Sequence, residues 1–221
     1  MRPAVKRALR RAGWEIRRAP GWPNFLGHLS PATVLDVGAA YGTPALYASF
    51  PNAHLVLIEP VSEYRPSLEA TLNGMQAELL TVAVGAEPTE LELQVDPGKL
   101  GRSSFHARTA LTSRDVALQP RRVEVRTLDG LLSEKGWQPP FFLKLDTEGH
   151  ELDVILGASS FLAETVAVLA EVSVAPRFQD GYRFHEFIGA MADAGFLVAN
   201  IIDAPSPHDG LVPWLNVLFE R

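Results

Sequence analysis

The sequence predicts an α/β fold in which a mostly parallel sheet carries helices on both faces. From Thr33 onward, short apolar runs alternate with helical segments, and strands that are buried on both faces of a sheet are apolar throughout. The last two runs have no helix between them, so the final strand is expected to return antiparallel. The seven predicted strands cover residues 34–37, 55–58, 79–84, 141–145, 166–172, 196–202 and 214–219.

Proline and glycine mark the ends of the helices between these strands. Pro44 suits the first turn of a helix that continues to Phe50. Pro66 suits the first turn of the next helix, which Asn73-Gly74 closes. Two later helices are predicted over residues 151–156, closed by Gly157, and over residues 185–194, closed by Gly195.

The pattern changes between residues 87 and 128. Residues 91–95 and 123–125 alternate apolar and polar side chains, which is typical of antiparallel strands with one buried face. A polar, basic loop separates them, and a loop of this length in a compact domain is usually functional. We expect it to cover the active site, the alternative being a loop without a role. Its polar and basic members are Lys99, Gly101, Arg102, Ser103, Ser104, His106, Arg108 and Arg114.

The composition describes an ordinary globular domain of 221 residues, with 47% hydrophobic and 21% charged residues. The chain has no cysteine, which excludes disulfides, thiolate catalysis and cysteine-ligated metals. No apolar run approaches the length of a membrane span, and the N-terminus lacks the apolar stretch of a secretory signal. We therefore expect a cytoplasmic protein without an integral membrane segment.

Charge is unevenly distributed along the chain. Residues 1–18 carry seven basic residues and one acidic residue, whereas the remainder carries 13 basic and 25 acidic residues. We predict a basic extension over residues 1–30, with a short helix over residues 4–18, ahead of a main domain over residues 31–221. The helix either packs its few apolar side chains on the domain or serves as an arm for an acidic partner or a membrane surface.

The turn after the first predicted strand suits a nucleoside ligand. Gly38 and Gly42 allow the backbone to approach a ligand closely, and Glu59 lies at the end of the next strand. A carboxylate at this position accepts hydrogen bonds from ribose hydroxyls. Asp36 lies within the first strand, where it could bind an ammonium group, orient the loop or stabilise the turn.

The spacing of the glycines argues against a ligand with phosphates. A dinucleotide turn has the pattern G-x-G-x-x-G, but Ala40 occupies the place of the middle glycine, and no Walker loop occurs. The carboxylate of Asp36 would also repel a pyrophosphate. A ligand with a ribose and no phosphate, such as S-adenosylmethionine, fits better. The alternative is an oxidoreductase that binds NAD at the same turn and at Glu59.

A second group of charged residues lies at the end of the fourth predicted strand. Lys144, Asp146 and Glu148 occupy alternate positions and therefore share one face while the chain stays extended. Open α/β sheets bind ligands at the carboxyl ends of their strands, where Glu171 of the fifth strand is also expected. Charges crowded there are costly unless they are paired or used. The crowded charges therefore predict a catalytic site. The alternative is an ion pair of Lys144 that only stabilises the turn.

These motifs resemble those of FkbM-type methyltransferases from about Thr33 to Phe219. The most specific is Lys144-Leu145-Asp146-Thr147-Glu148-Gly149, followed by Glu151. The others are Asp36-Val37-Gly38-Ala39 with Gly42, Ile58-Glu59-Pro60, Ala83-Val84-Gly85, Ser103-Ser104, Thr127-Leu128-Asp129, Gly157-Ala158 and Glu171. The resemblance implies a Rossmann-like class I methyltransferase fold, S-adenosylmethionine as donor and methylation of a hydroxyl oxygen on a small molecule or sugar.

Two positions depart from the pattern of this family. Ala40 stands where the family usually has asparagine, so one hydrogen bond to the cofactor is expected to be missing or replaced. Ser173 stands where it often has histidine, two residues after Glu171, which argues against a histidine base there. A catalytically decayed nucleoside-binding module is therefore a further alternative.

We expect three segments to bind the cofactor. The glycine turn would surround its methionine portion, Glu59 would hold the ribose, and the Ala83-Val84 pair would lie beside adenine. The full predicted set is Asp36, Gly38, Ala40, Tyr41, Gly42, Glu59, Pro60, Ala83 and Val84.

For catalysis, Asp146 is the first candidate to contact the acceptor hydroxyl. Glu148 or Glu171 would take its proton if burial raises the pKa of the carboxyl. Lys144 would orient these carboxylates or polarise the acceptor oxygen. His150 is another candidate base, although a histidine at the start of a helix is more often a surface residue. The spacing of the carboxylates does not require a divalent cation, and we predict no metal.

The acceptor is expected among three loops, over residues 99–120, 178–183 and 203–211. A nucleic-acid acceptor is not expected, because the body of the chain is acidic and a phosphate-binding surface needs basic residues. The side chains that could hold an anionic or aromatic small molecule are Arg102, Arg108, Tyr182 and Trp214.

Overall fold

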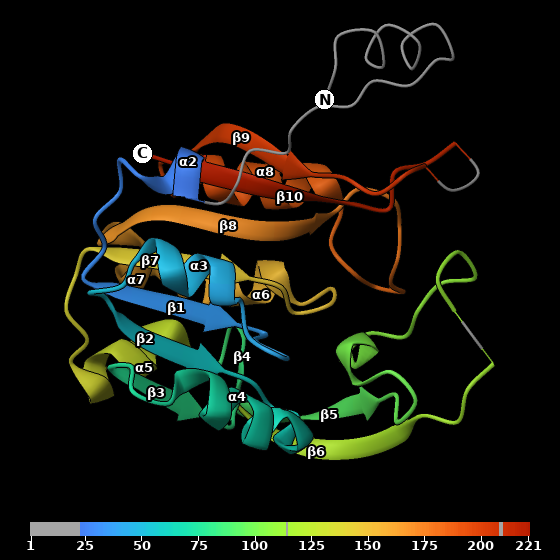
Figure 1. The fold of residues 1–221 in the computed structure, drawn as a ribbon. Helices are drawn as coiled ribbons and strands as arrows, with labels where there is room; N and C mark the ends of the chain where they lie inside the picture. Colours follow the sequence, from blue (N-terminus) through green and yellow to red (C-terminus); the bar gives the residue numbers. More distant parts are fainter. Residues whose placement is uncertain (1–22, 114, 208–209) are drawn as a thin grey trace, which may run out of the picture.

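The computed structural model describes residues 23–113, 115–207 and 210–221. The predicted basic helix over residues 4–18, and with it most of the extension over residues 1–30, lies outside these residues. The larger sheet has seven strands in the order β3-β2-β1-β7-β8-β10-β9, and Figure 1 shows how they lie. Its strands are β1 (Thr33–Val37), β2 (His54–Ile58), β3 (Ala77–Leu80), β7 (Phe141–Leu145), β8 (Thr165–Ser173), β9 (Leu197–Asp203) and β10 (Trp214–Glu220).

The order and direction of these strands confirm the predicted sheet. β1 is parallel to β2 and β7, and the same direction continues outward to β3 and β8. Of the described strands in this sheet, only β10 runs the other way, antiparallel to both β8 and β9. The fold is therefore the Rossmann-like class I methyltransferase fold, with an antiparallel last strand.

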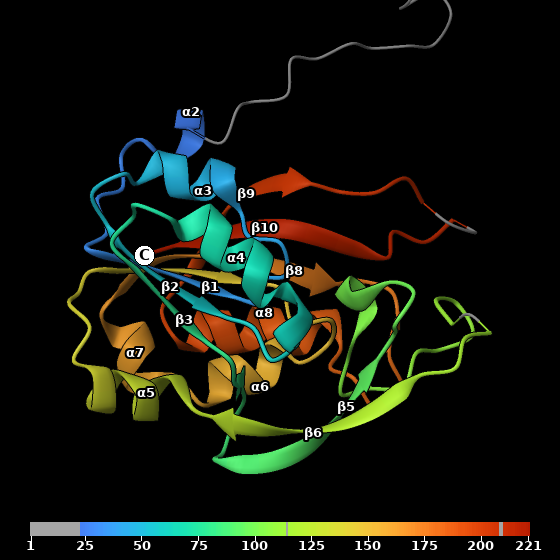
Figure 2. The same cartoon turned by 60° about the horizontal axis from the view of Figure 1, so that its bottom comes forward.

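Helices cover both faces of the sheet (Figures 1 and 2). The helices of one face are α2 (Pro23–Leu26), α3 (Pro44–Ser49) and α4 (Arg65–Leu72), and those of the other are α5 (Leu128–Lys135), α6 (Glu151–Leu156), α7 (Ser159–Ala163) and α8 (Phe184–Asp193). The core is divided in the same way, because successive side chains of a strand face opposite sides. Leu35 and Val37 pack with the second group of helices, whereas Val34 packs with the first.

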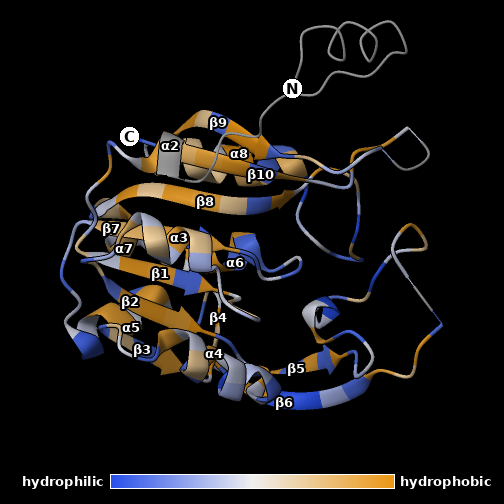
Figure 3. Cartoon of the chain, in the orientation of Figure 1, coloured by the Kyte–Doolittle hydropathy of each residue, from blue (hydrophilic) through white to orange (hydrophobic). Residues whose placement is uncertain are grey.

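A smaller sheet follows in the order β4-β6-β5 and consists of β4 (Ala83–Val84), β5 (Thr89–Val95) and β6 (Gln119–Arg126). β5 and β6 are antiparallel, as predicted, and Figure 3 shows hydrophilic colour along much of β6. The prediction of one strand over residues 79–84 is wrong. β3 ends at Leu80, and after the exposed Thr81 the chain leaves the large sheet to pair with β6. One apolar run thus supplies strands to two sheets.

Among the described residues, the structure has three α-helices that the sequence analysis does not predict: α2, α5 and α7. The Thr127 side chain caps α5 by accepting a hydrogen bond from an amide of its first turn, and Gly136 ends it in a left-handed conformation. The Asp129 carboxylate accepts hydrogen bonds from the amides of Ser160 and Phe161 in the first turn of α7. Across the described residues, none of the helices combines the length and the apolar character needed to cross a bilayer.

Candidate active site

The carboxyl ends of β1, β2, β7 and β8 border a cavity of about 150 Å³. This is the edge at which an open, parallel α/β sheet binds ligands. The loop over residues 99–113 also lines the cavity, through Leu100, Gly101, Ser103 and Phe105, which is the position expected of a cover. The predicted site residues on its wall are Gly38, Ala40, Glu59, Pro60, Ala83, Val84, Asp146, Glu148 and Glu171.

A second cavity adjoins the first at the ends of β1, β7 and β8. Its wall includes three further predicted residues, Tyr41, Gly42 and Lys144. The wall residues common to both cavities are Gly38, Ala40, Asp146 and Glu171. The two carboxylates among them therefore stand on the boundary between the cavities, where a group bound in one would face a group bound in the other.

Gly38 turns the chain at the end of β1 with a φ of +74°, a conformation that residues with side chains rarely adopt. A Cβ atom here would lie 1.8 Å from the carbonyl oxygen of Asp146, so no side chain fits. The Gly38 amide donates to the carbonyl of Ile58 at 2.9 Å, and the Asp146 amide donates to that of Val37 at 3.1 Å. The glycine thus lets the ends of β1, β2 and β7 meet.

Glu59 holds the next part of the same turn. Its carboxylate accepts hydrogen bonds from the Ala40 amide at 2.9 Å and the Val61 amide at 2.8 Å. Glu59 is 7% exposed, and burial raises the pKa of its carboxyl. Each carboxylate oxygen has more than one acceptor site, so Glu59 can fix the turn and still accept hydrogen bonds from ligand hydroxyls.

Ala40 adopts a left-handed conformation with a φ of +47°, which costs a residue with a Cβ about 1–2 kcal/mol. Replacing Ala40 by glycine is expected to raise the free energy of unfolding by about 0.5–1 kcal/mol, because the relief of strain exceeds the entropy that glycine adds to the unfolded chain. Urea denaturation measures the change. The control is the exposed Ala48 in α3, where glycine should lower stability by up to about 1 kcal/mol. Destabilisation by both substitutions would contradict strain at Ala40.

Asp36 and Lys144 form a buried ion pair beneath the turn. They are register partners on β1 and β7, and Nζ of Lys144 lies 3.1 Å from Oδ1 of Asp36. The Tyr47 hydroxyl donates to Oδ2 of Asp36 at 2.6 Å, and burial together with this carboxylate raises the pKa of Tyr47. Asp36 is 0% exposed and lies in the protein interior. Its predicted contact with a ligand ammonium stays a prediction.

Lys144 connects this ion pair to the boundary between the cavities. Its Nζ donates to the carbonyl oxygen of Gly38 at 3.2 Å and lies 3.6 Å from Oδ2 of Asp146. Burial acts to lower the pKa of Lys144, but the carboxylates of Asp36 and Asp146 outweigh it and raise that pKa. Lys144 therefore carries its positive charge beside Asp146 at neutral pH.

The turn after β7 presents Asp146 and Glu148 to the cavities. Glu151 holds this turn, because its buried carboxylate accepts hydrogen bonds from the amides of Thr147 at 2.8 Å and Gly149 at 3.1 Å. The φ angles of Glu148 and Gly149 are +52° and +103°, so the chain reverses sharply before α6 begins. The side chain of Asp146 remains 36% exposed and can be reached from the cavities.

Two arginines and two glutamates form a charge network beside the end of β8. Arg177 donates to Glu171 at 2.6 Å and to Oε2 of Glu148 at 2.7 Å, and Arg108 donates to the same oxygen of Glu148 at 3.0 Å. Burial and the charge of Asp146 raise the pKa of Glu171 to about 8, while Arg177 acts in the opposite direction. Glu148 is thus tied to two cations, whereas Glu171 lines both cavities.

Sequence reasoning does not identify Arg177 and Tyr64 as residues of the site. No motif marks Arg177, which becomes a site residue only because the segment after β8 folds back on Glu148. Tyr64 lines the first cavity, and its buried hydroxyl has no hydrogen-bond partner among the described residues, so it can donate to a ligand. The interpretation of His150 as a surface residue is wrong, because it is 6% exposed and lines the same cavity.

Of the four residues expected to hold an acceptor, Arg102, Arg108 and Tyr182 already have side-chain hydrogen-bond partners within the protein. Arg102 donates to the carbonyl oxygen of Thr112, and the Tyr182 hydroxyl accepts a hydrogen bond from the Ser173 amide at 3.1 Å. Trp214 is the register partner of Ser173 at the start of β10. In the loop over residues 203–211, residues 208 and 209 lie outside the described part of the chain.

Comparisons with known proteins give one curated relative and several solved structures. The AMB antimetabolite synthetase AmbE of Pseudomonas aeruginosa is 28% identical over 177 residues, a match that covers 64% of this chain and 8% of AmbE. The chain thus spans less than a tenth of that protein. Magnesium protoporphyrin IX methyltransferase of Synechocystis PCC 6803, solved with S-adenosylmethionine, is 13% identical with a TM-score of 0.48 over 90% of this chain and 74% of that one. EvdMO1 is 12% identical, with a TM-score of 0.48, and the match covers 98% of this chain and 47% of that one.

The family described as the methyltransferase FkbM domain matches residues 36–198. The matched region contains the glycine turn, Glu59 and the element that begins at Lys144. The first cavity suits S-adenosylmethionine, because it combines apolar walls for adenine, the Glu59 carboxylate for ribose hydroxyls, and the Tyr64 hydroxyl, which has no hydrogen-bond partner within the described part of the chain. S-adenosylmethionine is accordingly the cofactor, and the chain belongs to the FkbM methyltransferase family.

Proposed function

We propose that this methyltransferase methylates a hydroxyl oxygen of a small molecule or sugar. The observation that carries the proposal is the position of Asp146 and Glu171 on the boundary between the two cavities. Methylation of a hydroxyl requires removal of its proton, and a carboxylate whose pKa lies near neutral pH suits that task. Burial and the charge of Asp146 raise the pKa of Glu171 to about 8.

The cofactor would occupy the cavities according to the chemistry of their walls. Glu59 would hold the ribose and the Ala83-Val84 pair would lie beside adenine, while the turn from Gly38 to Gly42 would surround the methionine portion. S-adenosylmethionine, when bound, supplies a methyl group on a positively charged sulfur. The chain itself contributes mainly alignment of the acceptor, which can lower the barrier by several kcal/mol.

The proton of the acceptor would pass to Glu171, while Asp146 contacts and orients the hydroxyl. Of the two predicted bases, Glu171 is favoured over Glu148, because two arginines donate hydrogen bonds to the Glu148 carboxylate, whereas Glu171 lines both cavities. Lys144 and Arg177 would act as positioning residues, since they hold Asp146 and Glu171 through the ion pairs described above.

Two observations support a small acceptor. The curated relative is named an antimetabolite synthetase, and an antimetabolite is a small molecule. The chain has a net charge of −6, which disfavours a polyanionic acceptor such as a nucleic acid. To test the acceptor class, the purified chain is incubated with methyl-labelled S-adenosylmethionine and pairs of small molecules that differ only in a hydroxyl or an amine. Methyl ethers are the expected products, and labelling of the amines alone would contradict the proposal.

The pH dependence of methyl transfer tests the base. Glu171 must be ionised to accept a proton, so kcat/KM is expected to rise with pH and to level off above about pH 8. Glu171→Gln should lower kcat/KM by about 10²–10⁴-fold and remove this dependence. The control is Glu164→Gln, which changes an exposed residue just before the start of β8, at the end opposite Glu171. A variant at position 171 that keeps the profile of the unchanged protein would contradict the assignment.

A further inference from the structure

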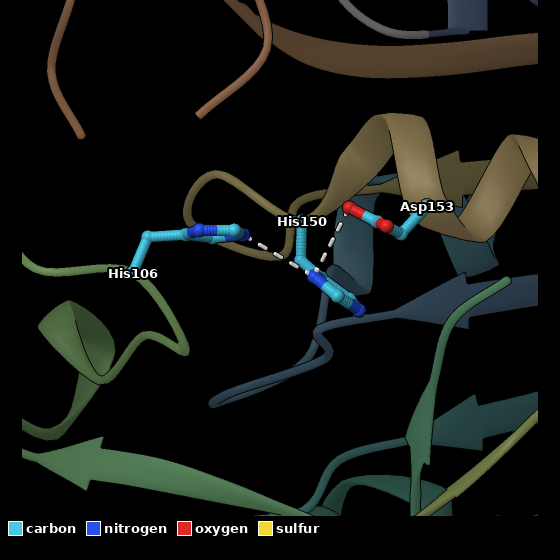
Figure 4. Close-up of side chains that lie close together, drawn as sticks. All are labelled: His106, His150 and Asp153. Carbon is cyan, nitrogen blue, oxygen red and sulfur yellow. Dashed lines mark hydrogen bonds and ion pairs between the residues drawn. The ribbon is translucent and has the colours of Figure 1, made fainter. Parts of the chain in front are cut away.

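Three potential metal ligands gather at the start of α6 (Figure 4). One of them, His150, lines the first cavity together with Asp146 and Glu171, the carboxylates that we assign to methyl transfer. Nε2 of His106 lies 3.3 Å from Nδ1 of His150, and the same nitrogen of His150 lies 3.3 Å from Oδ2 of Asp153. All three atoms lie within 4.8 Å of one another. The proposed methyl transfer uses none of these side chains.

The three ligands come from two segments that other interactions already hold together. His150 immediately precedes α6, and Asp153 lies in its first turn, so they share one face of the helix. His106 belongs to the loop over residues 99–113. Its amide donates to Oγ of Ser104 at 3.0 Å, and the Ser104 hydroxyl donates to the carbonyl oxygen of Glu148 at 2.7 Å. The cluster is therefore positioned by bonds that do not involve the ligand atoms.

Two of the three separations between the ligand atoms match one tetrahedral cation, and the third is within 4.8 Å. Zinc binds imidazole nitrogen and carboxylate oxygen at about 2.0–2.2 Å, so neighbouring ligand atoms around it lie about 3.3–3.5 Å apart. Both 3.3 Å separations in the cluster agree with this value. Nδ1 of a neutral His150 carries at most one proton, which serves one of its two neighbours, whereas a cation satisfies all three atoms.

The surroundings favour the form of histidine that binds metals. Burial lowers the pKa of both His106 and His150, so both are neutral at pH 7. The ring of Phe105 lies 4.9 Å from that of His150, and the ring of Phe178 lies 6.4 Å from that of His106, centroid to centroid. Two imidazoles and one carboxylate suit zinc and similar transition metals, whereas magnesium and calcium prefer oxygen ligands throughout.

We propose that His106, His150 and Asp153 bind a divalent transition metal of the zinc type, which joins the loop over residues 99–113 to α6. Three protein ligands leave the fourth position of a tetrahedral ion to water or a further ligand. The same loop and His150 both line the first cavity, so the metal fixes part of the wall of the cofactor site. The sequence analysis predicts no metal, because it considers only the carboxylates at the strand ends.

Calorimetric titration with Zn²⁺ tests the site in the full chain, after treatment with a chelator and removal of any affinity tag. One equivalent is expected to bind, and His106→Gln and Asp153→Asn should each weaken binding at least about tenfold. Both side chains are partly exposed, so the variants should fold. The control is His54→Gln, because Nε2 of His54 also lies near a carboxylate, 3.4 Å from Oε1 of Glu78. Among the described residues, His54 is not part of a group of three possible metal ligands. Failure of the unchanged protein to bind, or equal binding by His106→Gln, would overturn the site.

Hydrogen exchange tests whether the metal joins the two segments. Zn²⁺ should slow exchange of the amides over residues 99–113 in the unchanged protein and in His54→Gln, but not in His106→Gln. Unchanged exchange with one equivalent of Zn²⁺ bound would overturn the link between loop and helix. Both measurements are made without acceptor or S-adenosylmethionine, so their outcome is independent of the proposed O-methylation.

Discussion

Replacing Asp146 by asparagine is expected to lower the turnover of methyl transfer by about 10²–10³-fold. The carboxylate stands on the boundary between the cavities, where it can orient an acceptor hydroxyl, and Lys144 lies 3.6 Å from it. Asparagine keeps the shape of the side chain and removes its charge. The fold should persist, because Glu151 holds the turn and the Asp146 amide keeps its bond to the carbonyl of Val37.

The measurement combines steady-state kinetics with a calorimetric titration of S-adenosylmethionine. The affinity of Asp146→Asn for the cofactor should stay within about tenfold of the original value, because Glu59 and the glycine turn are unchanged. Asp193→Asn, at the exposed end of α8, serves as the control and should keep full turnover. Normal turnover by Asp146→Asn would contradict the role that we assign to Asp146. Circular dichroism excludes loss of the fold as the cause of a slow variant.

The large sheet could be predicted because its strands carry their own signals. The runs at β1, β2, β7 and β8 are mostly apolar, and the missing helix before β10 indicates its reversed direction. Asp36 shows where such reasoning stops. Its position within an apolar strand predicts an important carboxylate, but its partner Lys144 is set by the pairing of β1 with β7. That register depends on the packing of the whole sheet, and no local pattern encodes it.

The parts of the site that sequence reasoning misses depend on long-range contacts. Arg177 belongs to the site only because it binds Glu148 and Glu171. His106 contacts His150 just before α6, which lies far along the chain. The caps of α5 and α7, two of the helices that the sequence analysis does not predict, differ in the same way. Thr127 and Gly136 are local signals that could have predicted α5, whereas the Asp129 carboxylate caps α7 from a distant helix. Motifs thus predict the candidate carboxylates of the site, and tertiary structure determines which cations hold them.

Replacing Lys144 by methionine is expected to lower the free energy of unfolding by about 3–5 kcal/mol, because it leaves the fully buried carboxylate of Asp36 without its cation. Methionine fills a similar volume and cannot replace the charge. The remaining hydrogen bond from the Tyr47 hydroxyl does not compensate a buried negative charge. Urea denaturation at neutral pH measures the loss, with Lys135→Met as the control. Lys135 lies 3.5 Å from Glu78 in a partly exposed pair, whose loss should cost at most about 1 kcal/mol.

The double variant Asp36→Asn with Lys144→Met separates charge from packing. Asparagine at position 36 can still accept a hydrogen bond from the Tyr47 hydroxyl and leaves no net charge in the interior. Much of the stability lost in Lys144→Met should therefore return. If the double variant is as unstable as Lys144→Met, the lysine acts through packing and its bond to the Gly38 carbonyl rather than through the ion pair. Recovery of stability without recovery of methyl transfer would show that the same buried pair supports the fold and, through Lys144, the position of Asp146.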